Sequence, residues 1–525
     1  MKANNFRYNC YLKSQYFRMK KAFFCICAIL FLANAHSQLS VKISCTKEIR
    51  PAVNKGRLLV YFYKKDKPEP IHSIQPDDLK SSGNRFGSDV NWDGKKTIII
   101  NKLYGFPKKT LQDLDTGTYY VQAIYDIDTT TYRVFTSPNI YSSSKKIVIT
   151  KKGKEQIDII LDKQFEKESF KDEKFTKFVS VKSKLLSDFW KRDVIITACV
   201  RLPPSFDPAS SKKYPVCYTI GGFGTSCKNF AYNGPDSGYV NPWIRNKKPD
   251  MLQVLLDSDA PFGDSYQMNS ENNGPYMDAL LQELIPAIEQ KYHGEGTATS
   301  RFLTGGSTGG WVSLALQVFN PDFFNGCWSF YGDPVDFNFF QLVNIYKDEN
   351  AYVNRFGNSN PSKRTVYGEP VLSIKDEVYF ENTLGKNNSY VFSGDQWGSW
   401  NAVYSPKGKD GNPATIWDPE KGKIDTAVAN YWKKWDLNLY LQQHWKEIGP
   451  KLQGKLHIFM GDMDNYYLNN AMRLFEKFIT NTENPKSDVE MVFGPMKGHG
   501  WEPVNRIEVL QKMKERFDST TKKGF

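Results

Sequence analysis

One serine of this 525-residue chain lies in a turn whose sequence suits nucleophilic chemistry. The segment 304–310 reads Thr-Gly-Gly-Ser-Thr-Gly-Gly and so contains Gly-x-Ser-x-Gly around Ser307. A strand-like run precedes it, and an apolar run with helical spacing follows. In a strand–turn–helix of this kind glycines must replace side chains beside the serine, whose hydroxyl is then held out at the start of the helix. The pattern predicts that Ser307 is a nucleophile; an ordinary glycine-rich turn is the alternative.

A serine nucleophile needs a general base, and five histidines lie beyond residue 38. His499 follows a predicted strand and precedes the last predicted helix, so that it fits the chain order Ser, Asp or Glu, His. A surface-loop histidine is the alternative. The other four suit packing or surface roles better: His72, His293, His444 and His457.

The carboxylate that orients this histidine should follow the preceding predicted strand, residues 455–460. We favour Asp464, because Gly461-x-x-Asp464 is the usual spacing of that loop and a carboxylate there can hold the imidazole tautomer. Asp462 is interpreted as structural, and Asp333, after an earlier predicted strand, is a less favoured candidate. Each of the three could instead cap a loop.

Backbone N–H groups must also face the negative charge that develops during attack on a carbonyl. One should come from Thr308, directly after the nucleophile. The other should come from Gly222 or Phe223 in the glycine-rich run that follows a predicted strand at 216–220. An ordinary turn is again the alternative. The sequence contains no paired His or Cys spacing typical of a metal site, so no cofactor is expected.

The elements that must position these residues follow from the hydrophobic pattern beyond about residue 183. Alternating strands and helices predict an α/β fold, with a mostly parallel sheet covered on both faces. A long aromatic-rich segment at about 336–445 interrupts the alternation and is interpreted as an inserted cap. We predict strands over 194–200, 216–220, 252–256, 301–304, 326–331, 455–460 and 489–493, and helices over 276–292, 311–319, 469–480 and 504–517.

The region before it has a different pattern. Short β-branched and aromatic runs separated by turn residues predict a small all-β, sandwich-like domain over 39–162. A charged stretch, 163–182, is interpreted as a linker to the domain 183–525. No catalytic pattern occurs in the β-rich region.

The first 38 residues have the pattern of a signal peptide. Basic residues precede an apolar run over 22–33, and small residues follow it, which predicts cleavage at about Ala35–Gln38 and a secreted or periplasmic protein. The run is too short to span a bilayer, and no later run approaches that length. Met19 is an alternative start to Met1, and a buried first strand is the alternative structure.

Charge and cysteine content limit the partners and the compartment. The formal net charge of +13 falls to +7 beyond residue 38, and the basic residues are interleaved with acidic ones, so no nucleic-acid partner is expected. Buried free thiols are expected rather than a disulfide framework, because the cysteines beyond the leader are odd in number and widely spaced. They are Cys45, Cys199, Cys217, Cys227 and Cys327.

Together these motifs resemble the putative-esterase (esterase D) family, whose members include feruloyl and acetyl-xylan esterases, S-formylglutathione hydrolases and siderophore-ester hydrolases. The resemblance covers about residues 183–518 and rests on the runs 214–224, 305–310, 461–464 and 498–501. It implies the α/β-hydrolase fold and a triad of Ser307, Asp464 and His499. Ile220 stands where many relatives have His, and Gly500 where Asp is frequent, so the substrate class is not carried over.

We therefore expect a secreted serine esterase that hydrolyses a small-molecule or glycan-linked ester through an acyl-enzyme. Asn273 and Trp501 are candidate substrate-binding residues, and the six tryptophans of the insertion would suit a sugar or aryl substrate or else form a packed core. A peptidase or transacylase would share the same residues. A non-catalytic glycan-binding surface protein is the other alternative.

Overall fold

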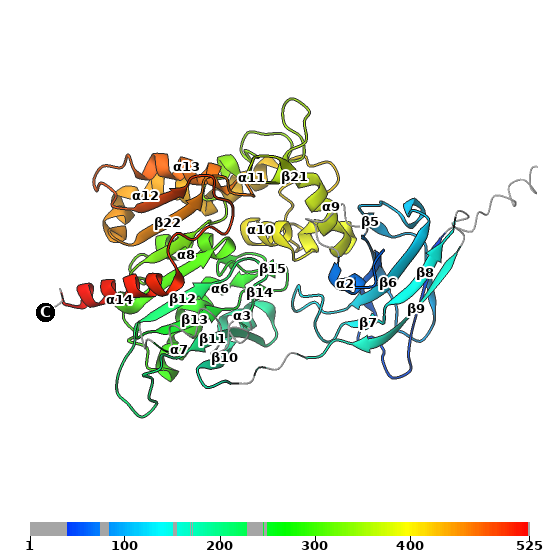
Figure 1. Ribbon diagram of the computed structural model, residues 1–525, viewed down its shortest axis with the longest axis horizontal. Coiled ribbons are helices and arrows are strands. Elements are labelled where there is room, and N and C mark those ends of the chain that lie inside the picture. Colours follow the sequence, from blue (N-terminus) through cyan, green and yellow to red (C-terminus); the bar gives the residue numbers. More distant parts are fainter. Residues whose placement is uncertain are drawn as a thin grey trace, which may run out of the picture.

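The computed structural model describes residues 39–73, 83–150, 155–167, 170, 172–227, 245 and 249–522. The predicted signal peptide lies outside the described residues. Two separate sheets organise the chain, one at each end of the molecule in Figure 1. Within the described residues, every helix is too short or too polar to span a bilayer.

The first sheet belongs to an N-terminal β domain, residues 39–164. Its order is β4-β1-β9-β7-β6-β2-β3-β5, with β8 also paired to β6; β1 and β9 are parallel and the other pairs antiparallel. The strands are β1 Ser40–Cys45, β2 Lys55–Tyr63, β3 Asn84–Asn91, β4 Ile98–Ile100, β5 Tyr104–Phe106, β6 Gly117–Asp126, β7 Ile140–Ser142, β8 Lys145–Ile149 and β9 Gln156–Gln164, with a short helix α2 at Pro70–Ser73.

Strand β2 is buried on both of its faces. Val60 and its alternate neighbours pack into the core of the β domain, whereas Leu59 and Tyr61 face the other way and pack with Phe380 of the insertion. Because successive strand residues point to opposite faces, the unbroken apolar run of β2 provides one core on each side. The β domain is thereby packed onto the second part of the molecule.

The second sheet has eight strands in the order β10-β11-β13-β12-β18-β19-β22-β23. Counted within this sheet the order is 1-2-4-3-5-6-7-8, with β11 antiparallel to its neighbours and all later pairs parallel. This is the topology of the α/β-hydrolase fold, so the predicted fold class is confirmed. The strands are β10 Thr176–Ser183, β11 Val194–Arg201, β12 Val216–Ile220, β13 Leu252–Leu256, β18 Arg301–Gly306, β19 Cys327–Phe330, β22 Leu456–Gly461 and β23 Glu490–Gly494.

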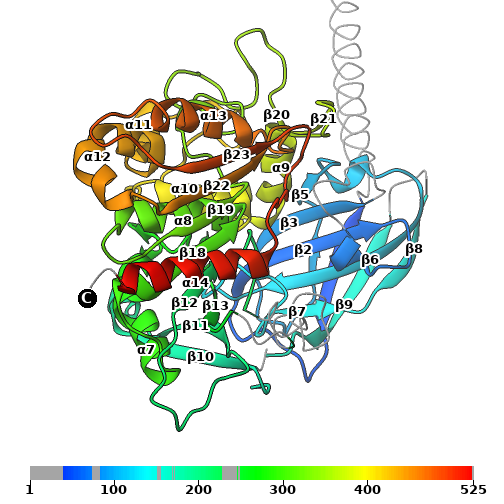
Figure 2. The ribbon, with the colours of Figure 1, turned by 60° about the vertical axis from the view of Figure 1, so that its left-hand side comes forward.

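Helices cover both faces of this sheet. One face packs against α8 and the helical run 276–291. The other face packs against α14, which crosses the sheet in Figure 2. The helices outside the insertion are α3 Lys184–Trp190, α6 Tyr276–Ala279 with the π-helical turn Leu280–Leu284 and α7 Ile285–Lys291, α8 Thr308–Phe319, α13 Leu468–Ile479 and α14 Arg506–Lys522. Short two-stranded ladders, β14 Asp259–Ala260 with β15 Gly263–Asp264 and β16 Asn269–Ser270 with β17 Gly274–Pro275, follow β13.

Part of the segment interpreted as a linker is a strand. β10 begins at Thr176, inside 163–182, and pairs antiparallel with β11 along its whole length. It lies at the edge of the sheet, where Lys177 and Lys182 form ion pairs with nearby aspartates. Charged side chains are usual on edge strands and give them the composition of a linker.

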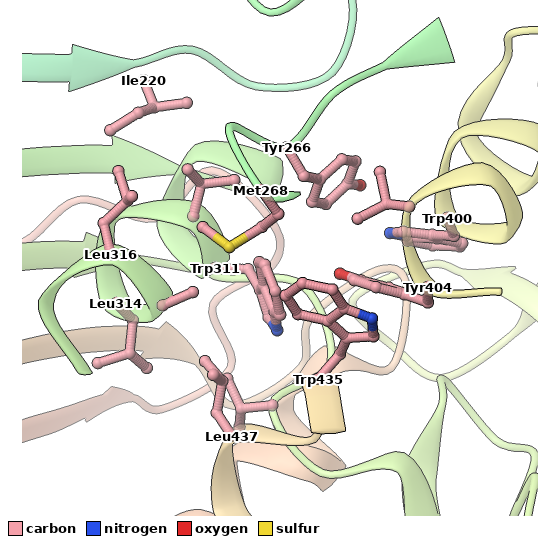
Figure 3. Packing of buried hydrophobic residues seen from close by; sticks show 14 of the residues in the cluster. Ile220, Tyr266, Met268, Trp311, Leu314, Leu316, Trp400, Tyr404, Trp435 and Leu437 are labelled. Atoms are coloured by element: carbon pink, nitrogen blue, oxygen red, sulfur yellow. The ribbon is translucent and has the colours of Figure 1, made fainter. Parts of the chain in front are cut away.

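The insertion between β19 and β22 packs as part of the main core. All six of its tryptophans are buried, and Trp400 and Trp435 lie in one cluster with Trp311 of α8 (Figure 3). The packed-core interpretation of these residues is therefore confirmed, and only Trp400 of the six also lines the cavity described below. The elements are β20 Pro361–Arg364, β21 Pro370–Ser373, α9 Ile374–Leu384, α10 Gln396–Tyr404, α11 Thr426–Trp432 and α12 Leu437–Leu452.

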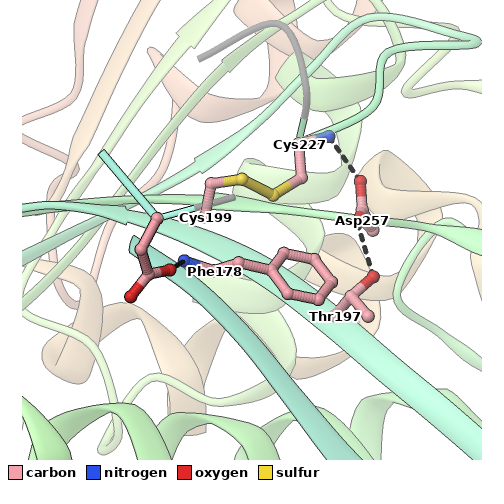
Figure 4. Close-up of a disulfide and its surroundings, with 6 residues drawn as sticks. Phe178, Thr197, Cys199, Cys227 and Asp257 are labelled. Carbon is pink, nitrogen blue, oxygen red and sulfur yellow. Dashed lines mark hydrogen bonds between the residues drawn. A yellow bond between two sulfur atoms is a disulfide. The ribbon is translucent and has the colours of Figure 1, made fainter. Parts of the chain in front are cut away.

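Two cysteines expected to be free thiols form a disulfide. Cys199 of β11 is bonded to Cys227, 28 residues away, in the loop that follows β12 (Figure 4). The Cys227 N–H also donates to Asp257, which accepts from Thr197 as well. The expectation was wrong because tertiary structure brings Cys227 next to β11, and no pattern in the local sequence indicates that contact. Cys45, Cys217 and Cys327 are free.

His457 lies inside β22, in the core. Its ring stacks on Trp328 with centroids 4.2 Å apart, and its Nδ1 lies 2.6 Å from a Glu490 carboxylate oxygen. Its Nε2 is buried with no hydrogen-bond partner among the described residues. Burial lowers the pKa of His457 below the usual 6.5, since a proton on Nε2 would lack an acceptor.

The lowered pKa of His457 predicts a pH-dependent stability contribution. The unfolded chain binds this proton more readily, so the contribution is present above pH 6.5 and is lost as the pH falls toward the folded-state pKa. His457→Phe keeps the ring stack and cannot titrate. As the pH falls from about 7.5 to about 5, the free energy of unfolding of the wild type should fall relative to that of His457→Phe, as measured by urea unfolding. A difference between the two free energies that does not change with pH would contradict a buried neutral histidine.

The disulfide predicts a second stability effect. Replacing both Cys199 and Cys227 by Ser should lower the free energy of unfolding by about 3 kcal/mol, because the bond closes a loop of intermediate length in the unfolded chain. Denaturant unfolding measures this loss. A reducing agent should lower the midpoint of the wild type toward that of the double variant and leave the variant unchanged; insensitivity of the wild type would count against the bond.

Candidate active site

Ser307 lies in the tight turn between β18 and α8. Its backbone has φ +59° and ψ −125°, a conformation that is rare for residues other than glycine. A Cβ at Gly305 would lie 2.4 Å from the Gly309 carbonyl oxygen, and one at Gly309 would lie 2.1 Å from that of Ile220. Glycine is therefore required at both positions by the close approach of β12 and α8.

His499 and Asp464 are in contact. His499 Nδ1 lies 2.7 Å from Asp464 Oδ2, and the Asp464 side chain is fully buried. The other carboxylate oxygen of Asp464 accepts from the Tyr466 N–H at 2.8 Å and the Leu468 N–H at 3.4 Å. This carboxylate is therefore fixed at the end of β22 and can hold the imidazole with its Nδ1 toward the protein interior.

The other two carboxylates considered form no hydrogen bond with His499, although Asp333 lines the same cavity as Ser307. Asp462 is exposed and forms an ion pair with Arg473 at 2.7 Å. Asp333 is buried and accepts hydrogen bonds from the Tyr266 hydroxyl at 2.7 Å and the Thr308 hydroxyl at 3.2 Å. Burial raises the pKa of Asp333 above its ordinary value. Its contacts support the start of α8 and do not reach His499.

Several side chains outside the predicted set hold the His499 loop. The rings of Tyr331 and Tyr466 pack edge-on against the imidazole, with centroids 4.8 and 4.9 Å away. Asn465 accepts from the His499 N–H at 2.8 Å and donates to the carbonyl oxygen of Arg364 in the insertion. The insertion thus contributes to the position of the histidine.

The glycine-rich loop after β12 lies against the serine. A Cβ at Gly222 would be 3.7 Å from Ser307 Cβ and from the Gly306 carbonyl oxygen. Thr308 is the first residue of α8, where backbone N–H groups have no acceptor within the helix. The predicted oxyanion donors are thus next to the predicted nucleophile.

Ser307 and His499 both line a cavity of about 720 Å³. Ser307, His499, Gly222 and Phe223 form its floor, and the insertion and the β domain provide its walls. The wall residues from the insertion include Gln341, Glu377, Phe380, Glu381, Asp395, Gln396 and Trp400, and those from the β domain include Tyr61, Ile71, Arg85, Tyr132, Arg133 and Phe135.

The sequence matches the family described as putative esterase over residues 193–501, more than half of the chain. The chain belongs to this family. It is therefore a carboxylic ester hydrolase, and the predicted resemblance is confirmed. No curated protein matches the chain.

Solved structures similar to this esterase are distant from it in sequence. A ferulic acid esterase is 15% identical, with 66% of this chain and 99% of the other covered and a TM-score of 0.39. An S-formylglutathione hydrolase from Agrobacterium tumefaciens is 13% identical, with 66% and 93% covered and a TM-score of 0.36. A fluorophosphonate-binding serine hydrolase from Staphylococcus aureus is 13% identical, with 65% and 98% covered and a TM-score of 0.36.

The walls of the esterase cavity carry the ionisable side chains of Arg85, Glu381 and Asp395. Burial raises the pKa of Asp395, while Arg85 opposes the shift. Burial likewise raises the pKa of Glu381, which accepts hydrogen bonds from the N–H groups of Trp397 and Gly398 at the start of α10. A cavity with these groups beside aromatic rings can contact both apolar and hydroxyl-bearing parts of a ligand.

Two predicted substrate-binding residues of the esterase lie outside the lining. Asn273 is fully buried in the turn between β16 and β17, where its carbonyl oxygen accepts from the Trp190 indole N–H at 3.0 Å. Trp501 packs on Gly494 and on the apolar cluster beneath α14. Both are held by packing, so the structure does not bring Asn273 and Trp501 to the cavity.

Sequence reasoning missed the β-domain side of the esterase cavity. Arg85 lies in β3, and Tyr132 and Arg133 lie in the connection between β6 and β7, all far from Ser307 in the chain. No local pattern marks them as functional. A usable signal was the length of that connection, which runs from 127 to 139, since loops of more than about 12 residues are often functional.

Proposed function

We propose that the protein is a secreted serine esterase that hydrolyses its substrate through an acyl-enzyme on Ser307. The observation that carries the proposal is the 2.7 Å contact of His499 Nδ1 with buried Asp464, beside the same cavity as Ser307. A buried carboxylate on Nδ1 leaves Nε2 to act as the base. The strained backbone of Ser307 supports the same role, because such strain concentrates at functional sites.

The proposed reaction has two halves. Ser307 Oγ attacks the carbonyl carbon while His499 takes its proton, and the N–H groups of Thr308 and of Gly222 or Phe223 stabilise the oxyanion. The intermediate collapses as the C–O bond to the alcohol breaks and His499 protonates the departing oxygen. Water then attacks the acyl-enzyme with His499 again as the base, which releases the acid and restores the serine.

The cavity lining supports small-molecule or glycan-linked esters with an aryl or sugar part as substrates. The lining includes the aromatic residues Phe223, Trp400 and Tyr466 and the amide side chains of Gln341 and Gln396. Flat apolar faces next to hydrogen-bonding groups suit an aromatic acyl group or a sugar. Its volume of about 720 Å³ exceeds the needs of a short acyl group alone.

The proposed location outside the cytoplasm has two supports. The leader predicted at residues 1–38 would direct export, and the Cys199–Cys227 bond suits an oxidising compartment.

Ser307→Ala tests the nucleophile. The wild type should hydrolyse at least one ester in a panel of acetyl, feruloyl and short-chain aryl esters and should react with a fluorophosphonate probe. The variant should lose labelling, and its kcat should fall about 10⁴-fold or more. Equal labelling of both proteins would refute the assignment, cleavage of amides but not esters would favour a peptidase, and no labelling of either would favour a glycan-binding protein.

Asp464→Asn tests the orienting acid. The amide would favour the wrong imidazole tautomer, so kcat should fall about 10³- to 10⁴-fold with a folded protein. Asp462→Asn is the matched control two residues away. Asp462 pairs with Arg473 at the surface, so the control should keep kcat within about twofold. Steady-state kinetics measures both, and equal losses would contradict the assignment of Asp464.

A further inference from the structure

One connection of the β domain leaves its own sheet and enters the cavity. This connection, residues 127–139 between β6 and β7, contributes Tyr132, Arg133 and Phe135 to the lining. It lies against the loop after β12, residues 221–227, which we call the oxyanion loop because it carries Gly222 and Phe223. The two loops belong to different sheets, so their contact depends on the docking of the β domain.

Arg133 joins the oxyanion loop to the short ladder of β14 and β15 in the hydrolase domain. Its Nε lies 2.6 Å from an Asp259 carboxylate oxygen, in the short ladder after β13. Its other two guanidinium nitrogens donate to the carbonyl oxygens of Gly224 at 3.4 Å and Thr225 at 3.5 Å. The planar guanidinium donates in several fixed directions, so a single side chain can hold both partners in one geometry.

Tyr132 packs on the same loop from the neighbouring position. Its ring centroid is 6.2 Å from that of Phe223. On its other side it contacts Gly394 of the insertion so closely that a Cβ there would lie 2.1 Å from the tyrosine Cβ. The side chain is therefore wedged between the insertion and the oxyanion loop.

The β domain that carries this connection is fixed to the insertion by two buried arginines. Arg57 Nη2 donates to the Thr383 carbonyl oxygen at 2.9 Å, and Arg85 Nη2 donates to that of Phe380 at 2.7 Å. These carbonyls lie in the C-terminal part of α9, where the helix dipole favours cations. Helix α9 lies beside β3 and β5 (Figures 1 and 2). These contacts therefore fix the position of the β domain, from which the connection 127–139 extends.

The oxyanion loop is fixed at its two ends. It leaves β12 after Ile220 and is tied again at Cys227 by the disulfide (Figure 4). Between these points a turn is closed by the Thr225 N–H donating to the Gly222 carbonyl oxygen at 3.0 Å. The guanidinium of Arg133 donates to carbonyl oxygens of this same turn. Oxyanion donors must be preorganised, because a displaced donor no longer matches the transition state.

We propose that the β domain acts in catalysis by positioning the oxyanion loop, and that Arg133 is the positioning residue. The proposal rests on the proposed function, because it assigns the loop as a source of an oxyanion donor. Arg133 itself need not touch the substrate. Its loss should therefore affect the transition state more than the bound substrate.

Arg133→Met, which keeps the bulk and removes the donors, tests this role. Its kcat should fall about 10- to 100-fold, with KM within about threefold. The Ki of an aryl boronic acid, which forms a tetrahedral adduct with the serine, should rise by the same factor as kcat/KM falls. Arg133→Lys should recover part of kcat through its ion pair with Asp259. Asp259→Asn, which removes that pair from the other side, should reproduce the loss.

Arg473→Met is the matched control, because it removes an arginine that lies in α13 and pairs with Asp462 and Glu476, away from the oxyanion loop and the β domain. It should keep kcat within about twofold. Equal losses of kcat in both arginine variants, a Ki for the boronic acid that does not change, or a loss confined to KM would each overturn the positioning role. A wild type without esterase activity or phosphonate labelling would overturn the proposed function as well, which separates the two failures.

Discussion

The close approach of β12, β18 and α8 at Ser307 is the constraint on which the rest of the site depends. No side chain fits at Gly305 or Gly309, since each would collide with a backbone carbonyl of a neighbouring segment. This proximity lets the chain leave β12 directly against the serine, so that a Cβ at Gly222 would lie 3.7 Å from Ser307 Cβ. The unusual backbone of Ser307 persists because the packed strand and helix on either side determine it.

The histidine is held by a second set of contacts that extends beyond the hydrolase sheet. Asp464 contacts Nδ1 of the imidazole from the end of β22. The side chain of Asn465 links the His499 loop to Arg364 in the insertion by hydrogen bonds. The insertion is in turn continuous with the main core, since Trp400 packs in the same cluster as Trp311. A cap built in this way is a fixed wall of the cavity and contributes to the stability of the whole domain.

Local motifs were predictable from the sequence, and long-range contacts were not. The predicted strands 216–220 and 252–256 match β12 and β13, whereas helix α8 begins at Thr308 and not at 311, because the glycines needed for packing are poor helix formers in isolation. The Asp464–His499 contact followed from loop spacing. The disulfide and Arg133 were missed because their partners lie 28 to 126 residues away and are brought near only by tertiary structure.

The catalytic groups and the surfaces that would select a substrate come from different parts of the chain. The groups that would form and break bonds come from the edge of one sheet, in motifs that the family shares. The surfaces that a substrate would meet beyond the ester come from the insertion and the β domain. These walls depend on how three parts of the chain dock, including the two arginines at the end of α9. Function resides in a site and not in a fold, so the substrate has to be inferred from these walls and not from the shared motifs.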